Sequence, residues 1–451
     1  MAKYKAYPEY KDSGIESLDI IPKMWSIKKL KYIFEIKKRI AGKIGFDVLS
    51  VTQKGIKIKD IESGEGQLSM DYSKYQRVYS GEFAMNHMDL LTGYVDISNY
   101  DGVTSPDYRV FAVRDKHIFY SRYYLYLLQD GYKQRRFFHL GQGSAHLGRW
   151  RLPTEAFNEI VYPCPSLTEQ IHIASFLDHE TAKIDNLIEK QQQLIELLKE
   201  KCQAVISHAV TKGLNPHVPM KDSGVEWLGE VPEHWVGSSL KYMAKVIDCK
   251  HITAEFSDVG IPVASISEVK SWFVDLSTAK LTNEKDYLLL IDGGRKPVCG
   301  DIIYSRNATV GEAAIVSDNM PDFAMGQDVC LIKTNQKVIP EFILYTLKSD
   351  IIAQQLNLAM IGSTFKRINV DDIRNFSIAI PPKNEQVLIV KTLMGKLEKY
   401  DRIISNAVDV ITYMQERRTA LISAAVTGKI DVRDWVAPDT QNVEEPQEAT
   451  A

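Results

Sequence analysis

Cysteine is scarce in this chain, and the few cysteines are too scattered to form a framework. The 451 residues include five cysteines, none in a C-x-x-C pair, so neither a disulfide scaffold nor a structural zinc site is expected. No apolar run approaches the roughly 20 residues that a membrane helix needs, and the opening MAKYKAYPEYKDSG has no apolar signal core. These absences predict reduced thiols, no membrane contact and a cytoplasmic location.

Enzyme signatures are missing as well. The sequence has no G-x-x-x-x-G-K-S/T phosphate loop and no D/N-P-P-Y/F adenine methyltransferase motif. Pro106 and Asp107 could begin a nuclease carboxylate set, but no Glu-x-Lys follows on a nearby strand. His87 with Asp89 nearby is an isolated combination, more often structural than catalytic. We therefore predict no catalytic residue, no metal ligand and no cofactor bound by this chain.

The charge balance excludes a globally basic protein. Lysine and arginine number 55 and aspartate and glutamate 58, which gives a formal net charge of −3. Any surface that binds nucleic acid must therefore be local. The length also exceeds what one compact core holds, so two or more domains are expected.

An internal repeat dominates the sequence. KDSGIESLDIIPKMWSIKKLKY (11–32) matches KDSGVEWLGEVPEHWVGSSLKY (221–242) at a constant offset of 210, which pairs Trp25 with Trp235. Identities this dense indicate a duplicated arm.

A second repeat follows each arm at an offset of 216. PSLTEQ (165–170) matches PPKNEQ (381–386), and AVISHAVT (204–211) matches ALISAAVT (420–427). The repeated frames enclose two variable inserts, roughly 33–160 and 243–376. A duplication of this order predicts a pseudo-two-fold molecule made from one chain.

The second repeat reads as a pair of long helices. Ser166 and Thr168 are good N-cap types, and no proline or glycine follows before Thr211. Gly213 and Gly428 come after the two copies, as helix stop signals do.

Apolar residues recur in both helices at heptad spacing, which favours an antiparallel coiled coil between the copies. The alternative is that each helix packs only on a local core. In the first copy these positions are Ile184, Leu187/Ile188, Leu194/Ile195, Leu198 and Val205/Ile206, with Gln191 in the seam. In the second they are Tyr400, Ile403/Ile404, Ala407, Val410/Ile411, Met414 and Leu421/Ile422.

The inserts read as mixed α/β and share a layout. Strands are expected at 47–51, 94–97, 109–113, 261–266, 301–304 and 313–316, and helices at 121–128 and 340–348. Each insert also has a glycine–acid pair before a hydrophobic strand, GEFAM (81–85) and GDIIY (300–304). The fold class is therefore α+β, with two α/β domains separated by the antiparallel helix pair.

A basic segment lies just before each long helix. KQRRFFHLGQGSAHLGRWR (133–151) combines five basic side chains with aromatic residues and glycines and has no acid, a composition that suits contact with phosphates and base edges. GSTFKR (362–367) recurs at the matching place, although a lone basic stretch is more often only a solvated surface. The candidate DNA-binding residues of the first insert are Lys133, Arg135, Arg136, Gln142, Ser144, His146, Arg149 and Arg151. Those of the second are Arg306, Asn307, Ser363, Thr364, Lys366 and Arg367.

These motifs together resemble the specificity subunit of type I restriction-modification enzymes. The resemblance rests on KDSGIE and KDSGVE, IPKMW and VPEHW, PSLTEQ and PPKNEQ, the two helix ends, and SPDYRVF (105–111). It implies that each insert is a target recognition domain reading one half of a split DNA site. It also implies partners: two methyltransferase subunits that use S-adenosylmethionine, and two motor-nuclease subunits that use ATP and magnesium.

Three other classes stay open: a coiled-coil scaffold, a single-chain methyltransferase or nuclease, and a specificity subunit of a methylation-only or other anti-phage system. The N-terminal arm is expected to pack near the C-terminal helix end. The expected boundaries are an arm at 1–29, a first recognition domain at 30–164, a helix and arm at 165–238, a second recognition domain at 239–380, a helix at 381–435 and a disordered acidic tail at 436–451.

Overall fold

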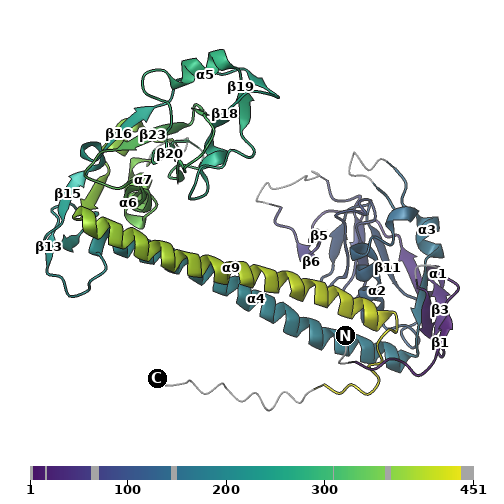
Figure 1. The fold of residues 1–451 in the computed structure, drawn as a ribbon. Helices are drawn as coiled ribbons and strands as arrows, with labels where there is room; N and C mark the ends of the chain where they lie inside the picture. Colours follow the sequence, from purple (N-terminus) through teal and green to yellow (C-terminus); the bar gives the residue numbers. More distant parts are fainter. Residues whose placement is uncertain are drawn as a thin grey trace. The chain divides into compact units, whose positions relative to one another are not determined.

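The computed structural model describes residues 4–15, 18–61, 71–143, 150–307, 309–360 and 367–437, and Figure 1 shows its elements. It divides into two units, residues 1–190 with 409–451 and residues 191–408. Most of the predicted acidic tail, from 438 onward, lies outside the described residues. No helix in the described ranges is long and apolar enough to cross a membrane.

The first unit is built on a four-stranded antiparallel sheet. Its strands follow the order β4 (Phe34–Lys37), β11 (Arg109–Val113), β8 (Phe83–Met85), β9 (Val95–Ile97). Phe83 and Phe111 stack at 5.0 Å between ring centroids, in a core that helix α2 (Ser121–Lys133) completes. Two short antiparallel strand pairs accompany this sheet: β5 (Leu49–Thr52) with β6 (Gly55–Ile58), and β7 (Gln76–Val78) with β10 (Gly102–Thr104).

The second unit has an equivalent four-stranded sheet, but the elements around it differ. The order is β16 (Ala244–Asp248), β23 (Val329–Thr334), β20 (Ile302–Ser305), β21 (Ala313–Ile315). A second sheet joins β17 (Phe256–Ser257), β19 (Lys280–Thr282), β18 (Ile261–Ala264) and β22 (Ala324–Met325). Its helices are α5 (Glu284–Ile291), α6 (Pro340–Leu347) and α7 (Asp350–Ala359). The two inserts thus share a central fold, as predicted, and differ around it.

The duplicated arms form the same small elements in both units. Short pairs join β1 (Tyr10–Asp12) to β2 (Ile20–Pro22), and β13 (Met220–Asp222) to β14 (Glu230–Pro232). Each arm then enters its domain: β3 (Ser26–Lys29) pairs with β12 (Val161–Cys164), and β15 (Val236–Ser239) pairs with β24 (Ser377–Ile380). Short helices flank these strands: α1 (Leu30–Ile33), α3 (Thr154–Glu159) and α8 (Val370–Arg374).

A buried tryptophan docks each arm onto the end of a long helix. Trp25 is 1% exposed and lies against Gly428, while Trp235 is fully buried and lies against Gly213. Both glycines have a φ of 76°, a left-handed conformation that ends helices and that glycine adopts at little cost. The N-terminal arm therefore packs on the C-terminal helix end, as predicted.

A buried glutamine explains the repeated T/N-E-Q motif. The Gln170 side chain accepts from the backbone N–H of Tyr120 at 2.8 Å and donates to Ile118 and Pro165 carbonyls at 3.0 and 2.9 Å. Gln386 makes the matching set, accepting from Ile339 at 2.9 Å. Each glutamine therefore fixes the start of a long helix to the domain before it.

The long helices are α4 (Leu167–Lys212) and α9 (Lys383–Val426), and both interpretations of their apolar stripe hold in part. Their ends contribute to the domain cores, and α4 and α9 also run antiparallel side by side within each unit. In the first unit Asp185 accepts two hydrogen bonds from Arg418 at 2.8 and 3.1 Å. Of the adjacent apolar residues predicted for the helix–helix contact, some lie outside it: Leu187 and Leu194 are exposed, while Ile195 is buried.

Candidate nucleic-acid interface

The two basic segments are anchored by equivalent backbone bridges. In the first unit Gln142 and Arg151 exchange N–H···O=C hydrogen bonds of 2.8 and 3.0 Å. In the second, Asn307 and Arg367 form the same kind of bridge. Arg151 and Arg367 are 216 residues apart, the offset of the second repeat, and both side chains are exposed.

The residue after each arginine ties the segment to the sheet. Leu152 is fully buried, and its N–H donates to the carbonyl of His87 at 2.8 Å. Ile368 is 1% exposed, and its N–H donates to the carbonyl of Arg306 at 3.0 Å. Since backbone hydrogen bonds and apolar burial fix both stems, each presents its arginine at an equivalent place.

The fourteen predicted DNA-binding residues fall into three groups. Exposed side chains belong to Lys133, Arg135, Gln142, Arg151 and Arg367. Side chains engaged within the protein belong to Arg136, Arg306 and Asn307. Ser144, His146, Arg149, Ser363, Thr364 and Lys366 lie outside the described residues.

Arg136 is directed inward. Its Nη2 lies 3.1 Å from Oδ2 of Asp130, whose side chain is only 1% exposed, and 3.4 Å from the Ser423 hydroxyl. Burial raises the pKa of Asp130, and the Arg136 charge opposes that shift. Arg136 therefore serves as the counter-charge of a buried carboxylate.

Arg306 is also internal. It is 3% exposed, and Nη1 lies 2.9 Å from Oδ1 of Asp248. Asp248, Cys249 and His251 are spaced as metal ligands could be. The adjacent guanidinium already neutralises the aspartate and disfavours a cation there, so no metal is assigned to this group.

A basic recess of about 810 Å³ adds residues that the sequence analysis missed. It brings Lys133 and Arg135 together with Lys54, from the β5–β6 turn, and Arg418, from α9, whose guanidinium pairs with Asp185 in the same lining. Burial and then the nearby Arg418 charge lower the pKa of Lys133. The missed residues are 79 or more positions away along the chain from Lys133, and no local sequence signal joins them.

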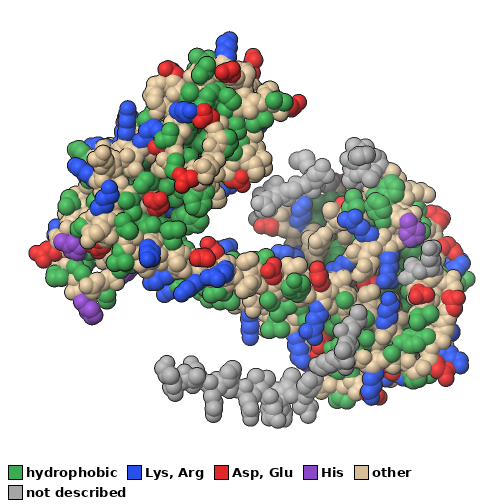
Figure 2. Space-filling model, viewed as in Figure 1, with side chains coloured by type: hydrophobic (Ala, Val, Ile, Leu, Met, Phe, Trp, Pro, Cys, Tyr) green, Lys and Arg blue, Asp and Glu red, His purple; other side chains and the backbone are tan. Residues whose placement is uncertain are grey.

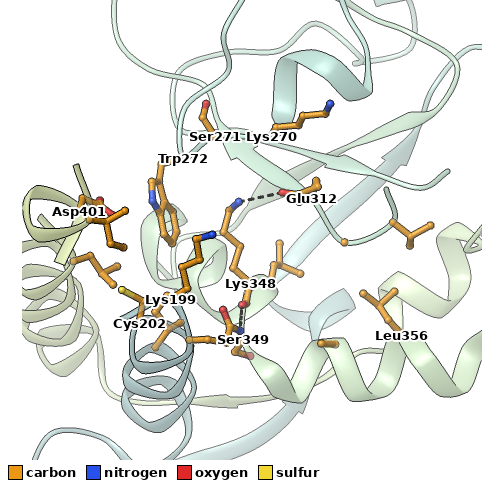
Figure 3. A pocket seen from close by; sticks show the side chains of 18 residues that line it. Lys199, Cys202, Lys270, Ser271, Trp272, Glu312, Lys348, Ser349, Leu356 and Asp401 are labelled. Atoms are coloured by element: carbon orange, nitrogen blue, oxygen red, sulfur yellow. Dashed lines mark hydrogen bonds and ion pairs between the residues drawn. The ribbon is translucent and has the colours of Figure 1, made fainter. Parts of the chain in front are cut away.

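The second unit has a recess of about 450 Å³ between its domain and the helix pair. Figure 3 shows Trp272, Lys348 and Glu312 beside it. The Lys348 ammonium lies 5.0 Å from the Trp272 ring centroid and 3.7 Å from the Glu312 carboxylate, so internal contacts hold this lysine. On the face visible in Figure 2, basic and acidic side chains are interspersed in both units, consistent with a local rather than a continuous basic surface.

Two copies of one α/β fold, each with an exposed arginine at an equivalent backbone bridge, define a class: a duplicated two-domain protein. The comparisons make the class specific. The family described as "Type I restriction modification DNA specificity domain" matches residues 22–197 and 232–407. The chain belongs to this family and contains two copies of its domain.

Relatives match over most or nearly all of the chain. The putative type I restriction enzyme MjaX specificity subunit of Methanocaldococcus jannaschii is 24% identical over 444 residues, covering 94% of this chain and 98% of the relative. The EcoBI specificity subunit of Escherichia coli is 22% identical and covers 72% of this chain and 71% of the relative. A chain in a solved structure described as "Structural basis underlying complex assembly and conformational transition of the type I R-M system" shares the fold, with a TM-score of 0.68, 13% identity and coverage of 91% and 99%.

Proposed function

We propose that this chain recognises a two-part DNA site, one part with each unit, and directs partner subunits to it. The proposal is carried by one observation: Arg151 and Arg367 occupy the same place on duplicated domains, each at the stem of a basic segment. Guanidinium groups bind phosphates and guanine edges. Two such sites on one chain suit a split target with an unread gap.

The recognition domains would be residues 30–164 and 239–380. Exposed Lys133, Arg135 and Gln142 would lie beside Arg151 on the DNA side of the first domain. Arg136 and Arg306 would support the surface from within through Asp130 and Asp248.

Partner enzymes would supply the chemistry, because specificity subunits are the non-catalytic components of type I complexes. Two methyltransferase subunits would bring S-adenosylmethionine and methylate adenine. Two motor-nuclease subunits would use ATP and magnesium. Exposed apolar side chains on the long helices, such as Leu197 and Tyr413, offer contact area of the kind that protein interfaces bury.

Selection from a random duplex library tests the proposal. The full chain, bound to its methyltransferase subunits, is expected to enrich two short sequence blocks at a fixed separation. Arg151→Ala and Arg367→Ala should each weaken binding to the selected duplex. A library with no enriched blocks would favour the scaffold alternative, and enrichment of one continuous block would refute reading by two domains.

A further inference from the structure

A small polar recess in the first unit is lined by three cationic side chains and one carboxylate, that of Asp107. Its volume is about 180 Å³, and it lies where β4, β8 and β11 meet the stem of the basic segment. The cationic side chains that line it are those of Lys38, Arg109 and Arg151. We call it the Arg109 recess.

Two buried polar atoms in this recess lack partners. Arg109 is 4% exposed and His87 is 8% exposed. In the described part of the chain, neither Nη1 of Arg109 nor Nδ1 of His87 has a hydrogen-bond partner. The other terminal nitrogen of Arg109 donates to the Leu152 carbonyl at 3.0 Å. Buried polar groups are normally satisfied, so these two atoms point to a missing ligand.

The buried guanidinium also lacks a counter-charge. Its carbon lies 4.5 Å from the Phe157 ring centroid, and no ion pair to Arg109 occurs among the described residues. Asp107 also lines the recess, but its side chain and that of Glu155 are exposed, and neither forms an ion pair with Arg109 in the described part of the chain. A buried charge is costly unless it is paired, and an anion entering the recess would provide the pair.

The second unit shows the same positions in a neutralised form. In the first unit, β4 pairs with β11 so that Lys37 lies opposite Val110, and the next residue, Lys38, therefore lies opposite Arg109. In the second unit, β16 pairs with β23 so that Asp248 lies opposite Cys330. The backbone carbonyls of His87 and Arg306 accept equivalent hydrogen bonds from the N–H groups of Leu152 and Ile368. The set Lys38, His87 and Arg109 in the first unit therefore corresponds to Asp248, Arg306 and Cys330 in the second. There Arg306 and Asp248 pair at 2.9 Å, so the second unit contains its own counter-ion.

We propose that the Arg109 recess binds one phosphate group of the DNA backbone, and that the second unit has no matching site. The proposal rests on the proposed function, which brings DNA to the stem that carries Arg151. A recess of about 180 Å³ holds a phosphate group, since one water takes about 30 Å³ of liquid volume. Guanidinium and ammonium groups at the rim and base supply the charge-assisted donors that a phosphate accepts.

Binding of inorganic phosphate to the full chain provides the first test. Histidine-selective labelling allows the His87 imidazole to be followed by NMR and assigned with His87→Gln. Phosphate is expected to shift the His87 signal saturably. Lys38→Asp, which introduces the acid found in the second unit, should weaken this response roughly tenfold or more. The control variant Lys37→Asp makes the same charge change on the neighbouring residue, which pairs with Glu35 and does not line the recess, and should weaken the response far less.

Duplex DNA provides the second test and identifies the source of the phosphate. A duplex added first should prevent inorganic phosphate from shifting His87. Lys38→Asp should also lower the slope of log affinity against log salt by about 0.9 relative to Lys37→Asp, the value for one lost phosphate contact. No response of His87 to phosphate would overturn the site, and a response that DNA fails to block would overturn the DNA assignment. If both results hold but the random library yields no enriched blocks, the recess stands and the proposed function fails.

Discussion

Replacing Arg136 should destabilise the first unit rather than weaken DNA binding directly. Arg136→Met removes the counter-charge of Asp130 and keeps an apolar stem. Asp130 is 2% exposed, so in this variant its carboxylate must take up a proton in the folded state. At pH 7 that uptake costs up to about 4 kcal/mol for a group with an unfolded pKa near 3.9. The usual loss on breaking a buried ion pair, about 3–5 kcal/mol, agrees with this limit.

The pH dependence follows from the same pair. Burial raises the pKa of Asp130, and removing Arg136 raises it further, so the variant folds with more bound protons than the unfolded chain. Its stability relative to wild type therefore improves as the pH falls. By pH 5 the protonation cost has dropped to about 1.5 kcal/mol, and most of the deficit should disappear.

Urea unfolding of the first unit at pH 7 and pH 5 measures both effects. Arg135→Met is the matched control, because Arg135 is exposed and no ion pair to it occurs in the described ranges. It should unfold like wild type yet bind DNA less tightly. Asp130→Asn combined with Arg136→Met should recover much of the lost stability. The reasoning is refuted if Arg136→Met keeps wild-type stability at pH 7 while it loses DNA affinity.

Three further predictions concern other parts of the same structure. Arg151→Ala and Arg367→Ala should each lower the salt slope of DNA binding by about 0.9, and slopes equal to wild type would remove them from the contact set. The pKa of His87 is lowered to about 3, first by burial and then by the nearby Arg109 and Arg151 charges. As the pH falls below 6.5, the His87 imidazole is therefore protonated in the unfolded chain but not in the folded one. The free energy of unfolding should fall by about 2–3 kcal/mol between pH 7 and pH 4.5. His87→Gln should lack that component in acid titrations of unfolding. Gln170→Leu should cost about 2–4 kcal/mol, because it leaves the backbone groups that Gln170 satisfies unpaired, and a loss under 0.5 kcal/mol in urea unfolding would contradict that role.

The repeats made the architecture predictable from the sequence. Trp25 and Trp235 mark arms that dock on helix ends, and the matching glutamines Gln170 and Gln386 mark helix starts. Periodicity and stop signals then located the long helices, whose observed bounds lie close to the expected ones. Local signals sufficed because each of these features depends on neighbours in the chain or on its repeated copy.

The candidate site was less predictable, because the fold decides which basic side chains stay exposed. Arg306 pairs with Asp248, 58 residues earlier in the chain. His87 and Asp89 were interpreted as structural rather than catalytic, and Asp89 accepts hydrogen bonds from the backbone of Leu91 and Thr92. His87 instead lines the recess that Arg109 completes. Composition identified basic segments, but only long-range strand pairing separates a buried arginine from an exposed one.

Long-read mapping of adenine methylation tests the central claim most directly. The chain would be expressed with the methyltransferase subunit proposed as its partner, and the map compared with that of a host lacking only this chain. We expect a split motif, with two short specified halves and a fixed gap, that appears only when the chain is present. Methylation that is absent, or that persists unchanged without this chain, would contradict the account.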